Sequence, residues 1–307
     1  MKILMIGGTR FIGRAAVSDL ANRGHDVVVM NRGLQPEHPD AARSITCDKN
    51  DRKNFVQVLT DEVWDVVIDT ILDDQELGFV GEHLRGKIKQ FIHTGSIGVY
   101  GAQTPIPARE TDLLAEHDEV YNFNHKLRQD QVLLRAHREH GFPGTSLRMS
   151  YIYGPGAVPL EGWGGRAPEF FQLLRDGQTV LLPGDGRALL HPGYVTDLAS
   201  AFGNALESPE TIGQVYNIAG PRAVMMKDYI AKIATELGVE PKIDYVDPEK
   251  ILQQFPELVD RRGLFFASEH MCCDISKARH EMGWQPETSL GAGLAKSVAW
   301  MRQEGHV

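Results

Sequence analysis

Residues 2–13 read Lys-Ile-Leu-Met-Ile-Gly-Gly-Thr-Arg-Phe-Ile-Gly, and this stretch decides the fold. An apolar run of strand length leads into two glycines, and a helical pattern then continues as far as Gly24. A glycine-rich turn between a strand and a helix directs main-chain N–H groups and the positive helix end at one point, which suits a pyrophosphate. The stretch therefore predicts a dinucleotide-binding turn, in which Gly7 allows the tight bend and Gly13 allows close packing of the helix.

The first half of the chain repeats this alternation of strand and helix. Strands are predicted at residues 2–6, 26–30, 44–47, 63–69, 90–94 and 145–149, and helices at residues 12–23, 50–60, 73–84 and about 118–140. Such alternation is typical of a parallel sheet built from βαβ units. After Tyr151, loops rich in glycine and proline separate shorter elements, which indicates a second lobe.

The predicted fold class is therefore α/β, with a Rossmann-type doubly wound parallel sheet and a smaller C-terminal α/β substrate lobe. We assign residues 1–165 to the dinucleotide-binding domain, with returning segments near 190–220. The substrate-binding lobe is predicted at residues 166–189 and 221–307.

Composition excludes several other classes of protein. Hydrophobic residues make up 42% and charged residues 24%, and no apolar run is long enough to cross a bilayer. The start of the chain lacks the pattern of a signal peptide, so we expect a cytoplasmic protein without a membrane partner. The three cysteines show no spacing typical of zinc ligands, and no metal site is expected. A net charge of −9 makes binding to nucleic acid unlikely.

The end of the second predicted strand bears on the choice of cofactor. The acidic residue that accepts hydrogen bonds from the adenosine ribose of NAD is expected there, but the sequence has Asn31-Arg32-Gly33. Asn31 would not repel a 2′-phosphate, and the guanidinium of Arg32 matches one, with Arg10 as a second cation nearby. We predict NADP(H) as the preferred cofactor, with NAD(H) possible. Asp48 could accept a hydrogen bond from the adenine amino group, or it could be a turn residue.

Several further segments follow one another in an order that is itself informative. They are Gly95-Ser96-Ile97-Gly98-Val99-Tyr100-Gly101, Leu147 to Gly156, Gly184-Asp185-Gly186, Tyr194 to Ala199, Val215 to Gly220, and Asp274 to Pro286. Together with the glycine turn they resemble the extended short-chain dehydrogenase/reductases, the family of NAD-dependent epimerases and dehydratases, over nearly the whole chain. The motif Gly-Gly-Thr-Arg-Phe-Ile-Gly is similar to that of the branch that contains chloroplast stem-loop-binding proteins. By this resemblance the cofactor residues are Gly7, Thr9, Arg10, Phe11, Ile12, Gly13, Asn31, Arg32, Asp48 and Lys126.

The resemblance also implies a catalytic set of Ser, Tyr and Lys, with the Lys four residues after the Tyr. Ser96 and Lys126 match, but Asn122 occupies the tyrosine position and the tyrosine is Tyr121. On a regular helix Tyr121 lies about 140° around the axis from Lys126. Either a bulge returns Tyr121 to Ser96, or another acid or base serves, or the chain binds cofactor without this chemistry. The candidates for another acid or base are Tyr100, Tyr151, His93 and His125.

The substrate site departs from the family pattern as well. Sugar-nucleotide members carry an arginine where this chain has Leu190, next to His191, which puts nucleotide-sugar binding in doubt. Arg166 and Arg187 could reach an anionic substrate instead. The residues predicted to bind substrate are Tyr100, Tyr151, Arg166, Arg187 and His191.

These observations favour an NADP(H)-dependent oxidoreductase or epimerase/dehydratase-like enzyme for a carbonyl or secondary alcohol of a small molecule or sugar derivative. The alternative is an RNA-binding or regulatory Rossmann protein that lacks standard dehydrogenase chemistry. The resemblance further implies a possible homodimer through the helices predicted at residues 73–84 and 118–140.

Overall fold

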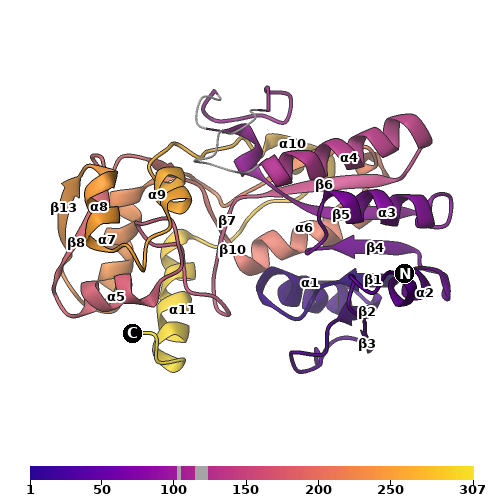
Figure 1. The fold of residues 1–307 in the computed structure, drawn as a ribbon, viewed down its shortest axis with the longest axis horizontal. Coiled ribbons are helices and arrows are strands. Elements are labelled where there is room, and N and C mark those ends of the chain that lie inside the picture. The colour runs from indigo at the N-terminus through magenta and orange to yellow at the C-terminus, as the bar shows by residue number, and fades with distance from the viewer. Residues whose placement is uncertain (102–104, 115–123) are drawn as a thin grey trace.

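The computed structural model describes residues 1–101, 105–114 and 124–307. It has an α/β Rossmann-like fold with a seven-stranded parallel sheet and a smaller, mainly C-terminal α/β region beside it (Figure 1). The strand order is β11-β6-β5-β4-β1-β2-β3, so the order reverses between β1 and β4. Such a reversal opens a crevice at the carboxyl ends of the strands, where doubly wound sheets bind their ligands. The strands of this sheet are β1 (Lys2–Ile6), β2 (Asp26–Asn31), β3 (Arg43–Thr46), β4 (Val66–Asp69), β5 (Gln90–Ser96), β6 (Gly144–Met149) and β11 (Val215–Ile218).

The pattern of β1 explains why its residues form a central strand. Ile3 and Met5 contribute to the apolar cluster on one face of the sheet, whereas Leu4 and Ile6 contribute to the cluster on the other face. All four side chains are fully buried. A parallel strand covered on both faces has an uninterrupted apolar run rather than an alternating one.

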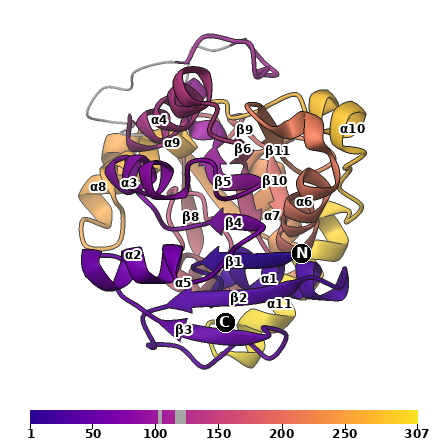
Figure 2. The same ribbon diagram turned by 90° about the vertical axis from the view of Figure 1, so that its right-hand side faces the viewer.

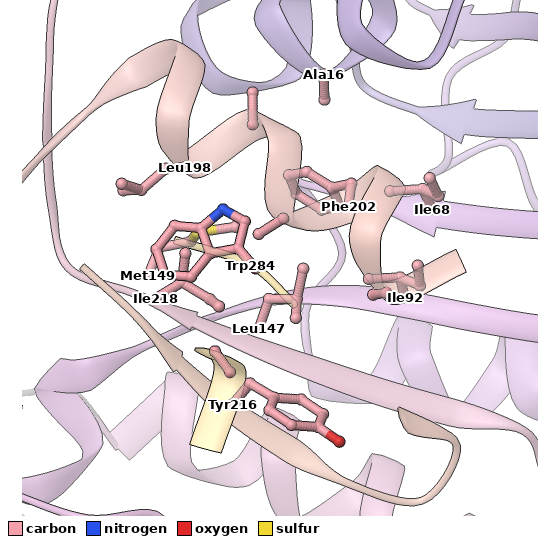
Figure 3. Packing of buried hydrophobic residues seen from close by; sticks show 14 of the residues in the cluster. Ala16, Ile68, Ile92, Leu147, Met149, Leu198, Phe202, Tyr216, Ile218 and Trp284 are labelled. Atoms are coloured by element: carbon pink, nitrogen blue, oxygen red, sulfur yellow. The ribbon is translucent and has the colours of Figure 1, made fainter. Parts of the chain in front are cut away.

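Helices cover both faces of the sheet. One face carries α1 (Phe11–Asn22) and α6 (Val195–Glu207), and the other carries α2 (Arg52–Thr60), α3 (Asp74–Leu84) and α4 (Asn124–His140), as Figure 2 shows. On the first face, Phe202 of α6 and the distant Trp284 fill the space above the strands (Figure 3). The fold of the sheet therefore depends on a segment near the C-terminus.

The second lobe is built around an apolar cluster of its own. Three two-stranded sheets lie outside the main sheet: β7 (Tyr151–Tyr153) with β10 (Pro192–Tyr194), β8 (Thr179–Pro183) with β13 (Lys242–Val246), and β9 (Leu189–Leu190) with β12 (Val224–Met225). The remaining helices are α5 (Pro168–Arg175), α7 (Met226–Leu237), α8 (Pro248–Gln254), α9 (Arg261–Ala267), α10 (Ser276–Met282) and α11 (Leu290–Gln303). Short 3-10 turns are η1 (Ile97–Tyr100) and η2 (Pro209–Thr211).

The predicted fold class is confirmed, and the six predicted strands of the sheet are present, with differences at their ends. The strand predicted at residues 63–69 begins only at Val66, because Val63 is exposed and Trp64 turns back to donate its indole N–H to the carbonyl of Val58. The helix predicted at residues 50–60 begins at Arg52, since the carboxylate of Asp51 caps it. The seventh strand, β11, comes from the segment near residues 190–220. The start of the helix predicted at 118–140 lies outside the described residues.

Two searches of the described part of the chain bear on the excluded classes. None of its helices is long and apolar enough to cross a membrane. It also contains no group of three or more His, Cys, Asp or Glu side chains arranged to hold a metal ion.

Candidate cofactor cleft and catalytic edge

The glycine turn after β1 leaves no room for side chains. Gly7 has φ +106°, and a Cβ there would lie 2.2 Å from the hydroxyl oxygen of Thr70. A Cβ on Gly13 would lie 2.8 Å from the main-chain nitrogen of Gly8, closer than real Cβ contacts allow. These two glycines therefore let the start of α1 approach the turn closely, as a pyrophosphate-binding turn requires.

A cleft of about 510 Å³ opens over this turn at the carboxyl ends of the strands. Its walls come from the segments that follow β1, β2, β3 and β4, the edge where doubly wound sheets bind ligands. The lining residues are Gly7, Gly8, Thr9, Arg10, Ile12, Met30, Asn31, Arg32, Leu34, Gln35, Cys47, Asp48, Lys49, Asn50, Thr70 and Ile71. Seven of the ten predicted cofactor residues thus line one cleft.

The polar groups in the cleft differ in whether neighbouring residues already form hydrogen bonds or ion pairs with them. The side-chain oxygen of Asn31 accepts a hydrogen bond from the N–H of Gly33 at 2.6 Å, which shapes the turn after β2. Asp48 accepts from the N–H of Asn50 at 2.9 Å, so it is a turn residue that also faces the cleft. Arg10 and Arg32 are exposed, and neither forms an ion pair with a carboxylate of the described residues. Within the described residues, the cleft therefore presents two guanidinium groups that have no ion-pair partner, with the carboxylate of Asp48 in the same lining.

Phe11 lies apart from the other predicted cofactor residues. Its φ of +38° is rare for a residue with a side chain, and its ring lines a neighbouring groove of about 400 Å³ with Pro155 and Gly156. The guanidinium carbon of Arg166 lies 5.3 Å from the centre of the ring. Phe11 thus joins the cofactor turn to the second lobe.

Ser96 ends β5, and Lys126 reaches the same strand from α4. The Nζ of Lys126 donates to the main-chain oxygen of Thr94 at 3.1 Å, two residues before Ser96. The hydroxyl oxygen of Ser96 accepts from the N–H of Gly98 at 3.1 Å and caps η1. Burial lowers the pKa of Lys126, and the charges of Asp69 and Asp130 oppose that shift. The lysine is thus a partly desolvated cation with two carboxylates in electrostatic reach.

A buried polar chain supports this lysine. Asp69, the last residue of β4, accepts from Nδ1 of His93 at 2.6 Å, and Nε2 of His93 lies 3.1 Å from the amide oxygen of Gln129. The other carboxylate oxygen of Asp69 accepts two main-chain N–H groups. Gln129 stands one helical turn after Lys126 on α4, so the chain fixes α4 against β4 and β5. Sequence reasoning considered His93 alone and missed Asp69, although a carboxylate at the end of a buried strand was a usable signal.

Two residues predicted to bind substrate, Tyr100 and His191, are buried. The hydroxyl of Tyr100 donates to Asn217 at 2.7 Å and accepts from Arg148 at 2.7 Å. The ring of His191 is buried between the main-chain oxygen of Gly220, 2.9 Å away, and the N–H of Cys273, 3.3 Å away. The polar atoms of both side chains thus have hydrogen-bond partners within the protein, and their role in substrate binding stays a prediction.

The remaining residues predicted to bind substrate or to take part in catalysis do not lie at one place. The hydroxyl of Tyr151 is buried and has no hydrogen-bond partner in the part of the chain that the structure describes. Arg166 lies at the junction of the two lobes, as the contact with Phe11 shows. Arg187 is on an exposed loop, 3.7 Å from the carboxylate of Asp185, and does not line the cofactor cleft. Tyr121 lies outside the described residues.

The fold and the cleft together define a protein of the dinucleotide-binding epimerase and dehydratase class. The chain belongs to the NAD dependent epimerase/dehydratase family, an NAD(P)-binding family whose profile matches residues 3–73 and 80–219. It is 31% identical to the chloroplast stem-loop binding protein of 41 kDa b from Arabidopsis thaliana, over 96% of this chain and 78% of that protein. It is 25% identical to a UDP-N-acetyl-alpha-D-glucosaminuronate decarboxylase of Bacillus cytotoxicus, over 98% of each chain.

Among solved structures, the fold is similar to that of UDP-glucose 4-epimerase from Bifidobacterium longum, determined in complex with NAD+ and UDP. The TM-score is 0.79 and the identity 19%, with 100% of this chain and 99% of that chain covered. At this identity the likeness concerns the fold alone.

Proposed function

We propose that this protein is an NADP(H)-dependent oxidoreductase or epimerase/dehydratase-like enzyme. The observation that carries the proposal is the cleft itself, in which the glycine turn, Arg10 and Arg32 converge at the edge that also holds Ser96 and Lys126. The substrate class is a carbonyl or secondary alcohol of a small molecule or sugar derivative. Relatives named as sugar-nucleotide enzymes support the sugar-derivative option.

The residues of the cleft fit the cofactor. The glycine turn offers main-chain N–H groups and the start of α1 to a pyrophosphate. Arg32 and Arg10 would take a 2′-phosphate, because the described residues give neither guanidinium a carboxylate partner. The nicotinamide, when bound, supplies hydride transfer. Lys126 would hold its ribose.

The chain's own groups would then manage the proton and the developing charge. Ser96 would donate its hydroxyl hydrogen to the substrate oxygen, since its hydroxyl oxygen accepts a hydrogen bond from the N–H of Gly98 and the hydrogen has no acceptor among the described residues. Tyr121 is proposed as the acid or base, with Tyr151 as its competitor because the Tyr151 hydroxyl has no hydrogen-bond partner among the described residues. Burial raises the pKa of Tyr151 well above its usual value, which makes it a proton donor rather than a base.

The cofactor part of the proposal is tested by fluorescence titration with NADPH and NADH. We expect tighter binding of NADPH, and Arg32→Ala should weaken NADPH binding about tenfold or more, since a charge-assisted hydrogen bond contributes about 1.5–3 kcal/mol. NADH binding should change little. Arg85→Ala is the matched control, because Arg85 is exposed and follows α3 at the opposite edge of the sheet. Tighter NADH binding, or unchanged NADPH binding by Arg32→Ala, would overturn the preference for NADP(H).

Turnover measurements on variants distinguish the catalytic roles proposed for these residues. With UDP-glucose and simple ketones as probes, the change in nicotinamide absorbance should be lost in Ser96→Ala and Lys126→Met. Comparison of Tyr121→Phe with Tyr151→Phe identifies the proton donor as the variant that abolishes turnover and keeps NADPH binding.

A second candidate function is RNA binding, which the 31% identity to a stem-loop binding protein favours. The net charge of −9 opposes it. Fluorescence anisotropy with a labelled RNA stem-loop decides between the two: salt-sensitive retention of RNA without cofactor-dependent turnover would support the RNA-binding function.

A further inference from the structure

Arg166 occupies a fixed position between the cofactor turn and the second lobe. Its Nη1 donates to the main-chain oxygen of Val158 at 2.5 Å, and its Nη2 donates to that of Ile152 at 2.7 Å. Its guanidinium carbon lies 5.3 Å from the centre of the Phe11 ring, within the range of a cation–π contact. Three contacts therefore orient this guanidinium before any ligand arrives.

The charge of Arg166 is not neutralised by the part of the chain that the structure describes. Arg166 forms no ion pair there. Two ionisable groups act on it electrostatically, Tyr229 and then Glu161, and the carboxylate oxygens of Glu161 accept the N–H groups of Trp163 and Gly165. Burial raises the pKa of Glu161 to about 7, so this group is a weak counter-ion near neutral pH.

Arg166 is exposed to solvent, so a ligand can reach its guanidinium. The protein atoms packed around the group lower its pKa by desolvation. Arg187 is the contrasting case, because its side chain is 67% exposed and lies 3.7 Å from Asp185.

A guanidinium has five N–H donors in a planar fork, and two contacts to carbonyl oxygens leave further donors for a ligand. An oriented, unpaired fork of this kind matches a carboxylate or a phosphate, with which it can form two parallel hydrogen bonds. Orientation before binding also reduces the entropy lost when the ligand is held.

We propose that Arg166 forms an anion subsite between the cofactor turn and the second lobe, which takes a carboxylate or phosphate group of the substrate. This subsite rests on the proposed function, since it places the anion beside the turn that binds the dinucleotide. It makes an anionic sugar derivative or acid the substrate class of the cleft. Arg166, not Arg187, is the residue that selects it.

The test uses the full chain saturated with NADPH, so that the cofactor covers Arg10 and Arg32. Inorganic phosphate and acetate are the probes, and their dissociation constants are measured by isothermal titration calorimetry and by the rise in melting temperature. We expect Arg166→Gln to weaken binding of the preferred probe at least tenfold, Arg166→Lys to retain part of it, and the control Arg187→Gln to bind as the wild type does. Tighter binding of phosphate would indicate a phosphate group of the substrate, and tighter binding of acetate would indicate a carboxylate group.

Three results would overturn the subsite. One is anion binding by Arg166→Gln equal to that of the wild type, and another is a wild type that binds neither probe while saturated with NADPH. The third is a tenfold loss of NADPH affinity in both Arg166 variants with unchanged anion binding, which would assign Arg166 to the cofactor. A wild type that does not bind NADPH refutes the proposed function itself, so the two failures are distinguishable.

Discussion

The close approach of α1 to the glycine turn can be tested with one methyl group. In Gly13→Ala the new Cβ would lie 2.8 Å from the nitrogen and 2.9 Å from the Cα of Gly8, and both are main-chain atoms that cannot rotate away. To reach an ordinary contact of 3.4 Å, the turn must recede by about 0.6 Å. That movement displaces the N–H groups that would hold a pyrophosphate.

The expected magnitudes follow from two opposing effects. An alanine within a helix is more favourable than a glycine by about 0.8–1 kcal/mol, whereas overpacking of a tight contact costs about 1–3 kcal/mol. Gly13→Ala should therefore change the free energy of unfolding by between zero and a loss of about 2 kcal/mol. Its NADPH affinity should fall at least tenfold, about 1.4 kcal/mol, because a weakened hydrogen bond to a charged group accounts for that much.

Gly81→Ala is the matched control. Gly81 is a buried glycine of α3, and a Cβ there would have no atom within 4 Å. This variant should gain about 0.5–1 kcal/mol of stability and bind NADPH as the wild type does. The assays are urea unfolding and fluorescence titration with NADPH. If Gly13→Ala is stabilised as much as Gly81→Ala and keeps wild-type affinity, the argument that this contact positions the cofactor is refuted.

Three further predictions concern groups away from the glycine turn. Burial raises the pKa of Glu161 from 4.5 to about 7, so this acid releases its proton at lower pH in the unfolded chain than in the folded one. The free energy of unfolding of the wild type should therefore fall by about 3 kcal/mol as the pH rises from about 4.5 to 7, whereas that of Glu161→Gln should not show this loss. Urea unfolding of both proteins at pH 5 and pH 8 measures the difference. Tyr100→Phe removes a hydroxyl that links Asn217 and Arg148, so it should lower the free energy of unfolding by about 1–3 kcal/mol and leave NADPH affinity unchanged. A loss of cofactor affinity or of turnover without a loss of stability would contradict a structural role for this hydroxyl. Arg148→Met leaves the buried carboxylate of Asp130 without its 2.7 Å partner and should cost about 3–5 kcal/mol in thermal and urea unfolding, whereas a loss below 1 kcal/mol would show that the pair is dispensable.

The sequence determined the framework because its signals are local. The apolar runs of the six predicted strands and the turn at Gly7 and Gly13 depend on neighbouring residues alone, and the structure has the corresponding elements with shifted ends. The end of β2 could also be predicted locally, since Asn31 is the last residue of the strand and Arg32 follows it directly. Predicted cofactor residues therefore line a common cleft.

Tertiary structure alone decided which polar groups remain open to a ligand. The hydroxyl of Tyr100 donates a hydrogen bond to Asn217, 117 positions away, and the ring of His191 accepts one from Cys273, 82 positions away. Arg166 and Arg187 look equivalent in the sequence, but only Arg166 is held at the junction of the lobes while its charge stays unpaired within the described chain. Whether a side chain is satisfied depends on partners brought by distant segments, and no local pattern records that pairing.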